Sequence, residues 1–455
     1  MPAGFDVIVI GAGPAGEIAA GRLAERGKAV ALVERELVGG ECSYWACMPS
    51  KALLRPGQLL RELRRVPGVA AADALDAEQV LLRRDEVIHQ LDDAAQLPWL
   101  EQRGVTLLRG HARLTGERRV AIDGPDGRAE HEAGTAVIVA TGSAPLLPPI
   151  PGLADADPWT SREATTAGAV PGELLVLGGG VVGVELAQAW ASLGARVTVI
   201  EAGERLIAGE EPFASAQVAE GLQQAGVELR IGARAVGVAR GTDGRTGVTL
   251  ADGEELCGDR LLVAVGRQPR TGDLGIETVG LAPGEAIEVG ETLRVPALPW
   301  LYAVGDVNGR ALLTHMGKHQ ARVAAAAICG DASPRLGRLD GPLSPRAIFT
   351  EPGVAAVGHT LASAHEAGIA GRAVDRETSG TAGASFHGRG ATGTTRFVVD
   401  RERDVLVGAT FVGPDVAELL HAATIAIAAE VPLATLAQAV PAFPTRSELW
   451  LDLDA

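Results

Sequence analysis

Two cysteines, Cys42 and Cys47, stand out as residues that could do chemistry, in the segment GGECSYWACMPSK. Residues five apart in a regular helix have Cα atoms roughly 8–9 Å apart, farther than a disulfide tolerates. A bond between these cysteines therefore requires an irregular segment, with a helix beginning inside it. A helix N-terminus lowers the pKa of a thiol and favours the thiolate. The pattern predicts a redox-active pair, the alternative being two ordinary buried thiols. Cys257 and Cys329 have no such neighbour and are predicted to be structural.

A glycine-rich turn upstream of this pair is expected to bind a dinucleotide. Gly11, Gly13 and Gly16 follow an apolar strand over residues 5–10 and precede a helical stretch. The first glycine permits a tight turn, the second lets the backbone approach a pyrophosphate, and the third lets helix and strand pack closely. The helix N-terminus offers free N–H groups to the phosphate. Glu34 ends the next strand, where a carboxylate can accept ribose hydroxyls. The alternative is a merely tight turn.

The same pattern recurs 178 − 11 = 167 positions later, with Gly178, Gly180 and Gly183. This separation is far too long for a solenoid repeat, so it predicts a second nucleotide-binding domain. Glu201 ends the following strand and would repel a 2′-phosphate. Arg205 is the nearest cation, and no arginine pair is adjacent. We therefore expect NADH to be preferred over NADPH.

The remaining elements must hold these two turns in place. A strand followed by a proline-rich connector, residues 136–152, suggests a domain boundary, and residues 261–270 are predicted to form one apolar strand that closes the inner domain. Residues 394–400 and 405–412 are expected to pair as strands, followed by a helix over 416–430. This last part indicates an α+β domain.

Composition narrows the class of protein. The 41 basic and 57 acidic side chains give a formal charge of −16, which argues against nucleic acid or an anionic membrane as partner. We find no apolar run of about 20 residues that could span a membrane, and no secretory signal at the N-terminus. We therefore expect a soluble, cytoplasmic protein. Without paired histidines we expect no metal site.

The cysteine segment resembles the G-G-x-C-x4-C-x-P-S-K signature of the class I pyridine nucleotide–disulfide oxidoreductases, such as lipoamide dehydrogenase, glutathione reductase and mercuric reductase. Four further segments resemble that family's motifs: VIVATGS (137–143), LLVAVGRQP (261–269), LYAVGDV (301–307) and IFTEPGVAAVG (348–358). The resemblance covers nearly the whole chain. It implies an α/β fold of two dinucleotide-binding, Rossmann-like domains and an α+β C-terminal dimerisation domain.

The resemblance also implies a division of the chain. The FAD-binding domain would comprise residues 1–148 and 271–340, the NAD(H)-binding domain 149–270, and the dimerisation domain 341–455. The family is homodimeric, and the C-terminus of a second copy completes each active site. The implied cofactors are FAD and NAD(H), with NADP(H) less favoured.

Site roles follow from the same resemblance. FAD would lie along the first glycine turn and Glu34, with Asp306 on its ribityl chain. Cys47 would face the flavin and Cys42 would exchange with the acceptor. Lys51 would lie near flavin N5, paired with Glu185, where a cation stabilises the reduced, anionic flavin. The other cofactor-binding positions carried by the motifs are Thr141, Gly142 and Gly266.

The chain departs from the family at its C-terminus. The family's H-P-T-x-x-E segment supplies a His–Glu dyad that protonates the departing thiolate; here Glu448 remains, but Phe443 stands in the histidine's place. Phenylalanine cannot transfer a proton, so we expect reduction of lipoamide or glutathione disulfide to be impaired. Mercuric reductases, soluble transhydrogenases and a branch that reduces and carboxylates ketopropyl–coenzyme M also lack this histidine. The last has phenylalanine there but replaces the glutamate.

Mercuric reductase uses a C-terminal cysteine pair, whereas this chain ends LWLDLDA. His315 and His319 could compensate for the missing histidine, although we expect that stretch to supply backbone contacts only. His387, in a polar glycine-rich stretch, is predicted to be a loop residue.

Three functions remain open at this stage. The first is electron transfer from NADH through FAD to the Cys42–Cys47 disulfide and on to a disulfide or other small acceptor. The second is reduction of quinones or metal ions mainly from the flavin. The third is a binding role as a flavoprotein subunit.

Overall fold

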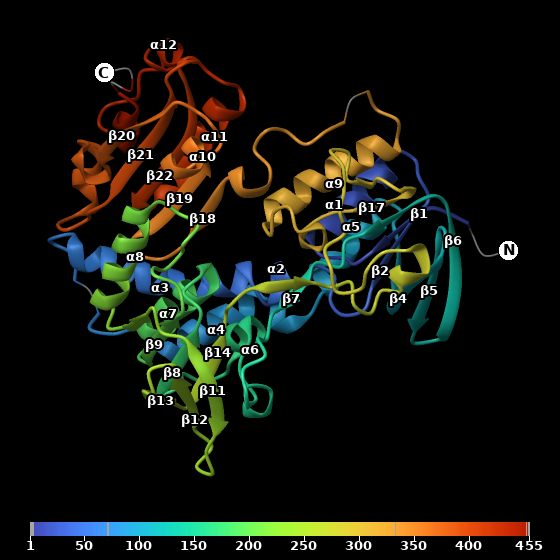
Figure 1. The fold of residues 1–455 in the computed structure, drawn as a ribbon, viewed down its shortest axis with the longest axis horizontal. Helices are drawn as coiled ribbons and strands as arrows, with labels where there is room; N and C mark the ends of the chain where they lie inside the picture. The colour runs from blue at the N-terminus through green and yellow to red at the C-terminus, as the bar shows by residue number, and fades with distance from the viewer. Residues whose placement is uncertain (1–3, 71, 333, 452, 454–455) are drawn as a thin grey trace. The chain divides into compact units, whose positions relative to one another are not determined.

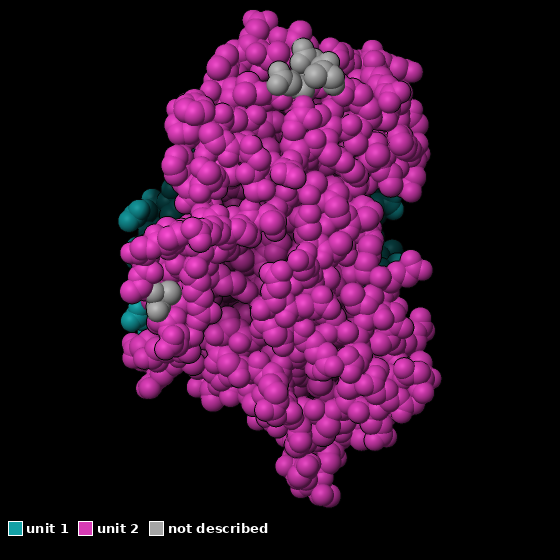
Figure 2. Space-filling model, turned by 90° about the vertical axis from the view of Figure 1, so that its left-hand side faces the viewer, with its two compact units in different colours: residues 1–48, 85–145, 267–342 teal, residues 49–84, 146–266, 343–455 magenta. Residues whose placement is uncertain are grey.

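The computed structural model describes residues 4–70, 72–332, 334–451 and 453. Figure 1 shows the fold of the chain as a ribbon. The chain divides into two compact units, which Figure 2 shows in different colours. Unit 1 comprises residues 1–48, 85–145 and 267–342, and unit 2 comprises residues 49–84, 146–266 and 343–455.

Unit 1 is built on a largely parallel sheet around β1 (Phe5–Ile10), which pairs with β2 and β6. Residues Val7 to Ile10 are apolar without alternation, as a strand buried on both faces requires. The strands of this sheet, in spatial order, are β16 (Arg294–Val295), β17 (Leu298–Ala303), β6 (Gly127–Val139), β1, β2 (Val30–Glu34) and β3 (Thr106–Arg109). Small apolar residues of α1 (Pro14–Glu25) and α9 (Thr314–Ile328) share its core. The predicted strand–turn–helix–strand order is confirmed.

Two smaller strand groups extend unit 1. β4 (His111–Gly116) and β5 (Arg119–Gly124) form an antiparallel extension with the first half of β6. β7 (Ser143–Pro145) pairs antiparallel with β15 (Arg267–Pro269). The helices of this unit also include α2 (Gly40–Tyr44) and α5 (Leu97–Glu101).

The first part of unit 2 repeats the parallel arrangement. Its four strands, in spatial order, are β10 (Glu228–Ile231), β9 (Arg196–Glu201), β8 (Glu173–Leu177) and β14 (Arg260–Val263). A meander of β11 (Ala235–Arg240), β12 (Thr246–Leu250) and β13 (Glu255–Gly258) follows. The accompanying helices are α4 (Ala77–Val87), α6 (Ser161–Thr166), α7 (Val181–Ser192) and α8 (Pro212–Gln224). The predicted strands at 173–177 and 196–201 are confirmed.

The C-terminal part of unit 2 is an antiparallel sheet with helices, as the α+β pattern predicted. Its strands, in spatial order, are β18 (Arg346–Ile348), β19 (Gly353–Gly358), β22 (Val405–Gly413), β21 (Thr394–Asp400) and β20 (Gly371–Glu377). The helices are α10 (Leu361–Glu366), α11 (Leu420–Ala428) and α12 (Leu433–Leu436). The predicted pairing of residues 394–400 with 405–412 is confirmed.

Two features differ from the sequence-based expectation. Residues 261–270 do not form one strand, because Gly266 adopts a φ of +147° and separates β14 from β15. Residues 49–84 belong to unit 2, because Leu53, Leu54 and Val80 pack in the same apolar core as the sheet of β8 and β9. The assignment of cofactors to domains stays a prediction.

Candidate active site

The cysteine pair sits where two helices meet. Cys42 lies in α2, Trp45 leaves helical geometry with a φ of −132° and a ψ of 0°, and Cys47 is the first residue of α3 (Cys47–Arg65). The interruption supplies the irregular segment that the pair requires, and the helix begins inside the motif as predicted. The positive end of the α3 dipole lies at Cys47 and favours a thiolate there.

Both cysteines are present as thiols, and they contact each other. A hydrogen bond between them raises the pKa of Cys42, burial raises it further, and Lys318 opposes the shift. The Sγ atom of Cys47 lies 3.4 Å from the hydroxyl of Thr314, the first residue of α9. The structure thus places the two sulfur atoms close enough to exchange a disulfide bond for two thiols.

The first glycine turn has the steric features of a pyrophosphate site. Gly11 has a φ of +100°, and a Cβ there would stand 2.5 Å from the carbonyl oxygen of Ala140. A Cβ on Gly16 would collide with the carbonyl oxygen of Gly11. A Cβ on Gly13 would meet no described atom within 4 Å. The fold therefore needs the first and third glycines, whereas Gly13 leaves open space at the uncapped N-terminus of α1, where a phosphate fits.

Glu34 fixes this turn from the end of β2. The carboxylate is 9% exposed and accepts hydrogen bonds from the backbone N–H groups of Ala12, at 2.7 Å, and Glu36, at 2.7 Å. Each carboxylate oxygen has a further lone pair that ribose hydroxyls could use. The donor set therefore fits the adenosine end of a dinucleotide.

The second glycine turn is built in the same way. Gly178 has a φ of +109°, a Cβ on Gly183 would collide with the carbonyl oxygen of Gly178, and a Cβ on Gly180 would meet no atom of the described residues within 4 Å. The carboxylate of Glu201 accepts hydrogen bonds from the N–H groups of Gly179, at 2.6 Å, and Gly203, at 2.5 Å. The close match of the two turns indicates the same kind of ligand at both.

Arg205, the nearest cation to this second turn along the chain, is engaged elsewhere. Its guanidinium donates to the backbone carbonyl oxygens of Glu210, at 2.7 Å, and Ala208, at 2.6 Å. An arginine held in this way is poorly placed to neutralise a 2′-phosphate beside Glu201.

Lys51 and Glu185 form an ion pair within unit 2. The Lys51 Nζ lies 2.7 Å from the Glu185 carboxylate and 4.8 Å from the ring centre of Phe349. Glu185 is buried, and its other oxygen accepts a hydrogen bond of 2.8 Å from the N–H of Phe349. The carboxylate therefore holds the lysine from a fixed position, while the role of this pair beside a flavin stays a prediction.

Asp306 begins a short 3-10 helix, η5 (Asp306–Asn308), in unit 1. It accepts a hydrogen bond of 2.6 Å from Ser143, and Arg267 lies 3.9 Å away. Burial raises the pKa of Asp306, and the hydrogen bond from Ser143 opposes this. A half-buried carboxylate beside a hydroxyl suits a polyol chain.

The other motif positions lie in backbone turns. Thr141 donates to the carbonyl oxygen of Arg270 at 2.9 Å, and Gly142 has a φ of +70°. Gly266, in unit 2, has a φ of +147° and accepts a hydrogen bond from the N–H of Leu146 at 3.0 Å. These contacts show turn geometry, and cofactor binding at these positions stays a prediction.

The C-terminal segment displays the departure from the family pattern. Phe443 is 78% exposed, and Val440 is equally exposed. Glu448, in η10 (Arg446–Trp450), accepts a long hydrogen bond of 3.4 Å from the N–H of Gly383. The carboxylate that would orient a histidine is present, and an apolar ring stands at the histidine's position.

Sequence reasoning missed one acid in unit 1. Glu17 lies in the first turn of α1, and burial raises its pKa to about 7, with Lys318 lowering it and Glu34 raising it. An acid in a first helical turn usually indicates only a favourable interaction with the helix dipole, so the sequence carries no sign of this shift. Glu17 can therefore change its charge near neutral pH.

Comparison with known proteins bears on both units. Residues 5–327 match the family model described as pyridine nucleotide-disulphide oxidoreductase, and residues 344–453 match the dimerisation domain of that family. The chain is 34% identical over 458 residues to a dihydrolipoyl dehydrogenase of Haloferax volcanii, covering 98% of this chain and 94% of that protein. It is 34% identical over 434 residues to a mercuric reductase of Shigella flexneri, covering 92% of this chain and 75% of that protein.

Solved structures give the same result. The Cu(II) complex of the HOCl-induced flavoprotein disulfide reductase RclA from Escherichia coli superposes with a TM-score of 0.87 and 25% identity, covering 98% of each chain. LpdA from Mycobacterium tuberculosis superposes with a TM-score of 0.85 and 29% identity, covering 97% of each chain. Among the described residues, no helix combines the length and apolar character needed to cross a bilayer.

Proposed function

Because the chain belongs to the pyridine nucleotide-disulphide oxidoreductase family, we propose that it carries electrons from NADH to the Cys42–Cys47 pair and on to a small acceptor that reacts at Cys42. It is a flavin-dependent enzyme that uses FAD and a nicotinamide dinucleotide, so the binding-only alternative is not retained. The contact between the thiol of Cys42, in α2, and that of Cys47, at the start of α3, carries the proposal. The dimerisation domain supports a homodimer.

The residues divide the work as follows. FAD, when bound, supplies the link that passes electron pairs between the nicotinamide and the cysteines. Gly13, the α1 N-terminus and Glu34 would hold it in unit 1, and Gly180 with Glu201 would hold the nicotinamide dinucleotide in unit 2. Lys51, fixed by Glu185, supplies a positive charge. Cys47 has the helix dipole to stabilise a thiolate, whereas Cys42 resists losing its proton.

The proton on the Cys42 thiol restricts which acceptors the enzyme can reduce. In the family a histidine exchanges it, and Phe443 cannot. A metal ion needs no such proton-exchanging residue, because it binds thiolate sulfur directly and displaces the proton. The 34% identity to a mercuric reductase also favours a soft metal ion as a second candidate acceptor, beside disulfides whose leaving thiols are acidic.

Steady-state assays with NADH and NADPH side by side test the donor preference. We expect kcat/KM for NADH to exceed that for NADPH by about 100-fold, because a carboxylate beside a 2′-phosphate costs several kcal/mol. Glu201→Gln should lower the ratio of kcat/KM for NADH to that for NADPH, and Glu204→Gln, three residues along the chain, serves as the matched control. A preference for NADPH would contradict the role of Glu201.

The same assays, repeated with a cyclic disulfide, a quinone and Cu(II) or Hg(II) as acceptors, test the proposed function. Turnover of any of them that needs Cys42 supports it. Turnover that depends only on the flavin contradicts it.

The open space at Gly13 and Gly180 provides a second test. Gly13→Ala should fold, since its Cβ meets no described atom within 4 Å, but it should weaken FAD retention by roughly tenfold, about 1.4 kcal/mol. Gly180→Ala should raise the KM for NADH and leave the flavin content unchanged. Flavin absorbance after gel filtration separates the two. Equal flavin loss in both variants would contradict the assignment of the two turns.

A further inference from the structure

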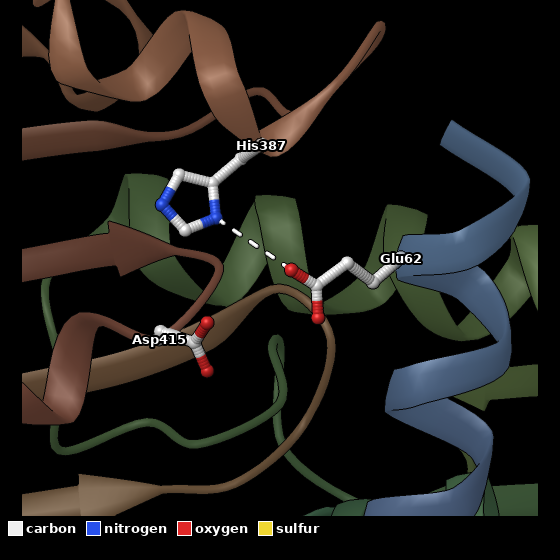
Figure 3. Close-up of side chains that lie close together, drawn as sticks. All are labelled: Glu62, His387 and Asp415. Atoms are coloured by element: carbon white, nitrogen blue, oxygen red, sulfur yellow. Dashed lines mark ion pairs between the residues drawn. The ribbon is translucent and has the colours of Figure 1, made fainter. Parts of the chain in front are cut away.

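Three potential metal ligands meet in unit 2, far from the cysteines in sequence. Glu62 projects from α3, His387 ends the 3-10 helix η8 (Gly383–His387), and Asp415 precedes η9 (Val416–Leu419). Their ligand atoms all lie within 4.8 Å of one another. Figure 3 shows the imidazole Nδ1 facing the Glu62 carboxylate, 4.0 Å away, with Asp415 close by.

Backbone contacts hold two of these segments together. The N–H of Arg389 donates to the carbonyl oxygen of Arg65 at 3.1 Å, which ties the chain after His387 to α3 one turn beyond Glu62. Gly388 has a φ of +88°, and a Cβ there would stand 2.5 Å from the same carbonyl oxygen. The backbones that carry Glu62 and His387 are therefore packed against each other, so the two side chains are held close together by the fold.

The local charge favours a cation. Among the described residues, no lysine or arginine nitrogen comes within ion-pair distance of either the Glu62 or the Asp415 carboxylate, and His387 is the only ion-pair partner of Glu62. Arg446 interacts electrostatically with Asp415. Burial lowers the pKa of Arg446, and Asp415 and Glu351 offset this in part. Two carboxylates thus lie beside one imidazole, and no described lysine or arginine forms an ion pair with either carboxylate.

We propose that Glu62, His387 and Asp415 bind a divalent transition-metal ion of the Zn²⁺ type. One imidazole and two carboxylates form a ligand set typical of such ions, whereas Ca²⁺ and Mg²⁺ prefer oxygen alone. With bonds of about 2.1 Å, tetrahedral ligand atoms stand roughly 3.4 Å apart, so the side chains close in by about an ångström. Glu62 and His387 are part-buried and Asp415 is exposed, which leaves a fourth position for water.

The ion would join the end of α3 to the C-terminal domain within unit 2. Because it binds the folded chain, Zn²⁺ at about 100 times its dissociation constant should raise the midpoint of thermal unfolding by roughly 3 °C. This role is separate from electron transfer, so NADH-dependent reduction of the flavin should not change.

Equilibrium dialysis of the oxidised holoenzyme against Zn²⁺ tests the site. Wild type and the control variant His421→Gln, an exposed histidine on α11, should bind about one zinc ion more than Glu62→Gln or His387→Gln. Cys42 and Cys47 are the same in all four proteins, so any zinc they bind cancels. Equal binding in all four proteins would overturn the proposal.

A measurement on the wild type alone guards against misfolded variants. Zn²⁺ should slow modification of His387 by diethylpyrocarbonate, followed by peptide mass spectrometry, and leave His421 unchanged. If both histidines react at the same rate with and without Zn²⁺, the site does not exist.

Discussion

Cys42→Ser should lower kcat/KM for the physiological acceptor by about a thousandfold or more, the scale seen when an enzyme loses its nucleophile. The flavin content should be unchanged, because the substitution leaves in place the first glycine turn and the hydrogen bonds that Glu34 accepts from Ala12 and Glu36. Flavin reduction by NADH should also persist, since that step needs unit 2's second glycine turn rather than the thiol. The substitution is nearly isosteric, so a folding defect is not expected.

Stopped-flow bleaching of the flavin by NADH, run beside steady-state turnover, measures both effects. Cys257→Ser is the matched control, because Cys257 is an exposed free cysteine outside the pair. Cys42→Ser also distinguishes acceptors that react at the thiol from those that react at the flavin. Disulfides and thiol-binding metal ions should lose turnover, whereas a quinone that reacts at the flavin should keep it. Unchanged turnover of every acceptor would remove the cysteine pair from the mechanism.

The glycine turns could be predicted from sequence because their chemistry is local. Glycine is required at positions 11 and 16 by contacts close to one strand–turn–helix unit, and the same holds for Gly178 and Gly183. The break in the predicted strand over 261–270 could not be foreseen, because the apolar residues before Gly266 look the same whether the strand continues or turns there. Glycine in a strand-like run is consistent with either a bulge or a break, and only tertiary pairing distinguishes them.

Contacts between segments distant in sequence are the second kind of feature that could not be predicted from local patterns. The ion pair of Lys51 with Glu185 was implied by family resemblance, since no spacing rule joins residues 134 positions apart. The placement of residues 49–84 depends on Leu53 and Val80 joining a core that includes Leu174 of β8, and no local sequence pattern predicts this contact. His387 was expected to be a loop residue, and only the fold brings it to Glu62.

Phe443→His should raise NADH-dependent reduction of lipoamide by about 100-fold, within the range that general acid–base catalysis supplies. Phe443 is 78% exposed in the chain, so the substitution should change stability by no more than about 0.5 kcal/mol. The family pairs this histidine with the glutamate that is kept here as Glu448. Among the described residues, the side chain of Glu448 accepts one long hydrogen bond, 3.4 Å, from the N–H of Gly383. In the homodimer, we propose that this histidine serves the cysteine pair of a second copy.

The pH profile distinguishes a proton donor from a change in fit. A histidine donates only when protonated, so the gain should fall as pH rises through the ordinary histidine pKa of about 6.5. Phe443→Leu, the apolar control, should stay at the wild-type rate at every pH. Adding Glu448→Gln to Phe443→His should remove most of the gain while leaving flavin reduction by NADH intact. A gain that is independent of pH, or that survives the loss of Glu448, would show that the phenylalanine limits access to the cysteines. In that case the absent proton donor would not explain the acceptor range.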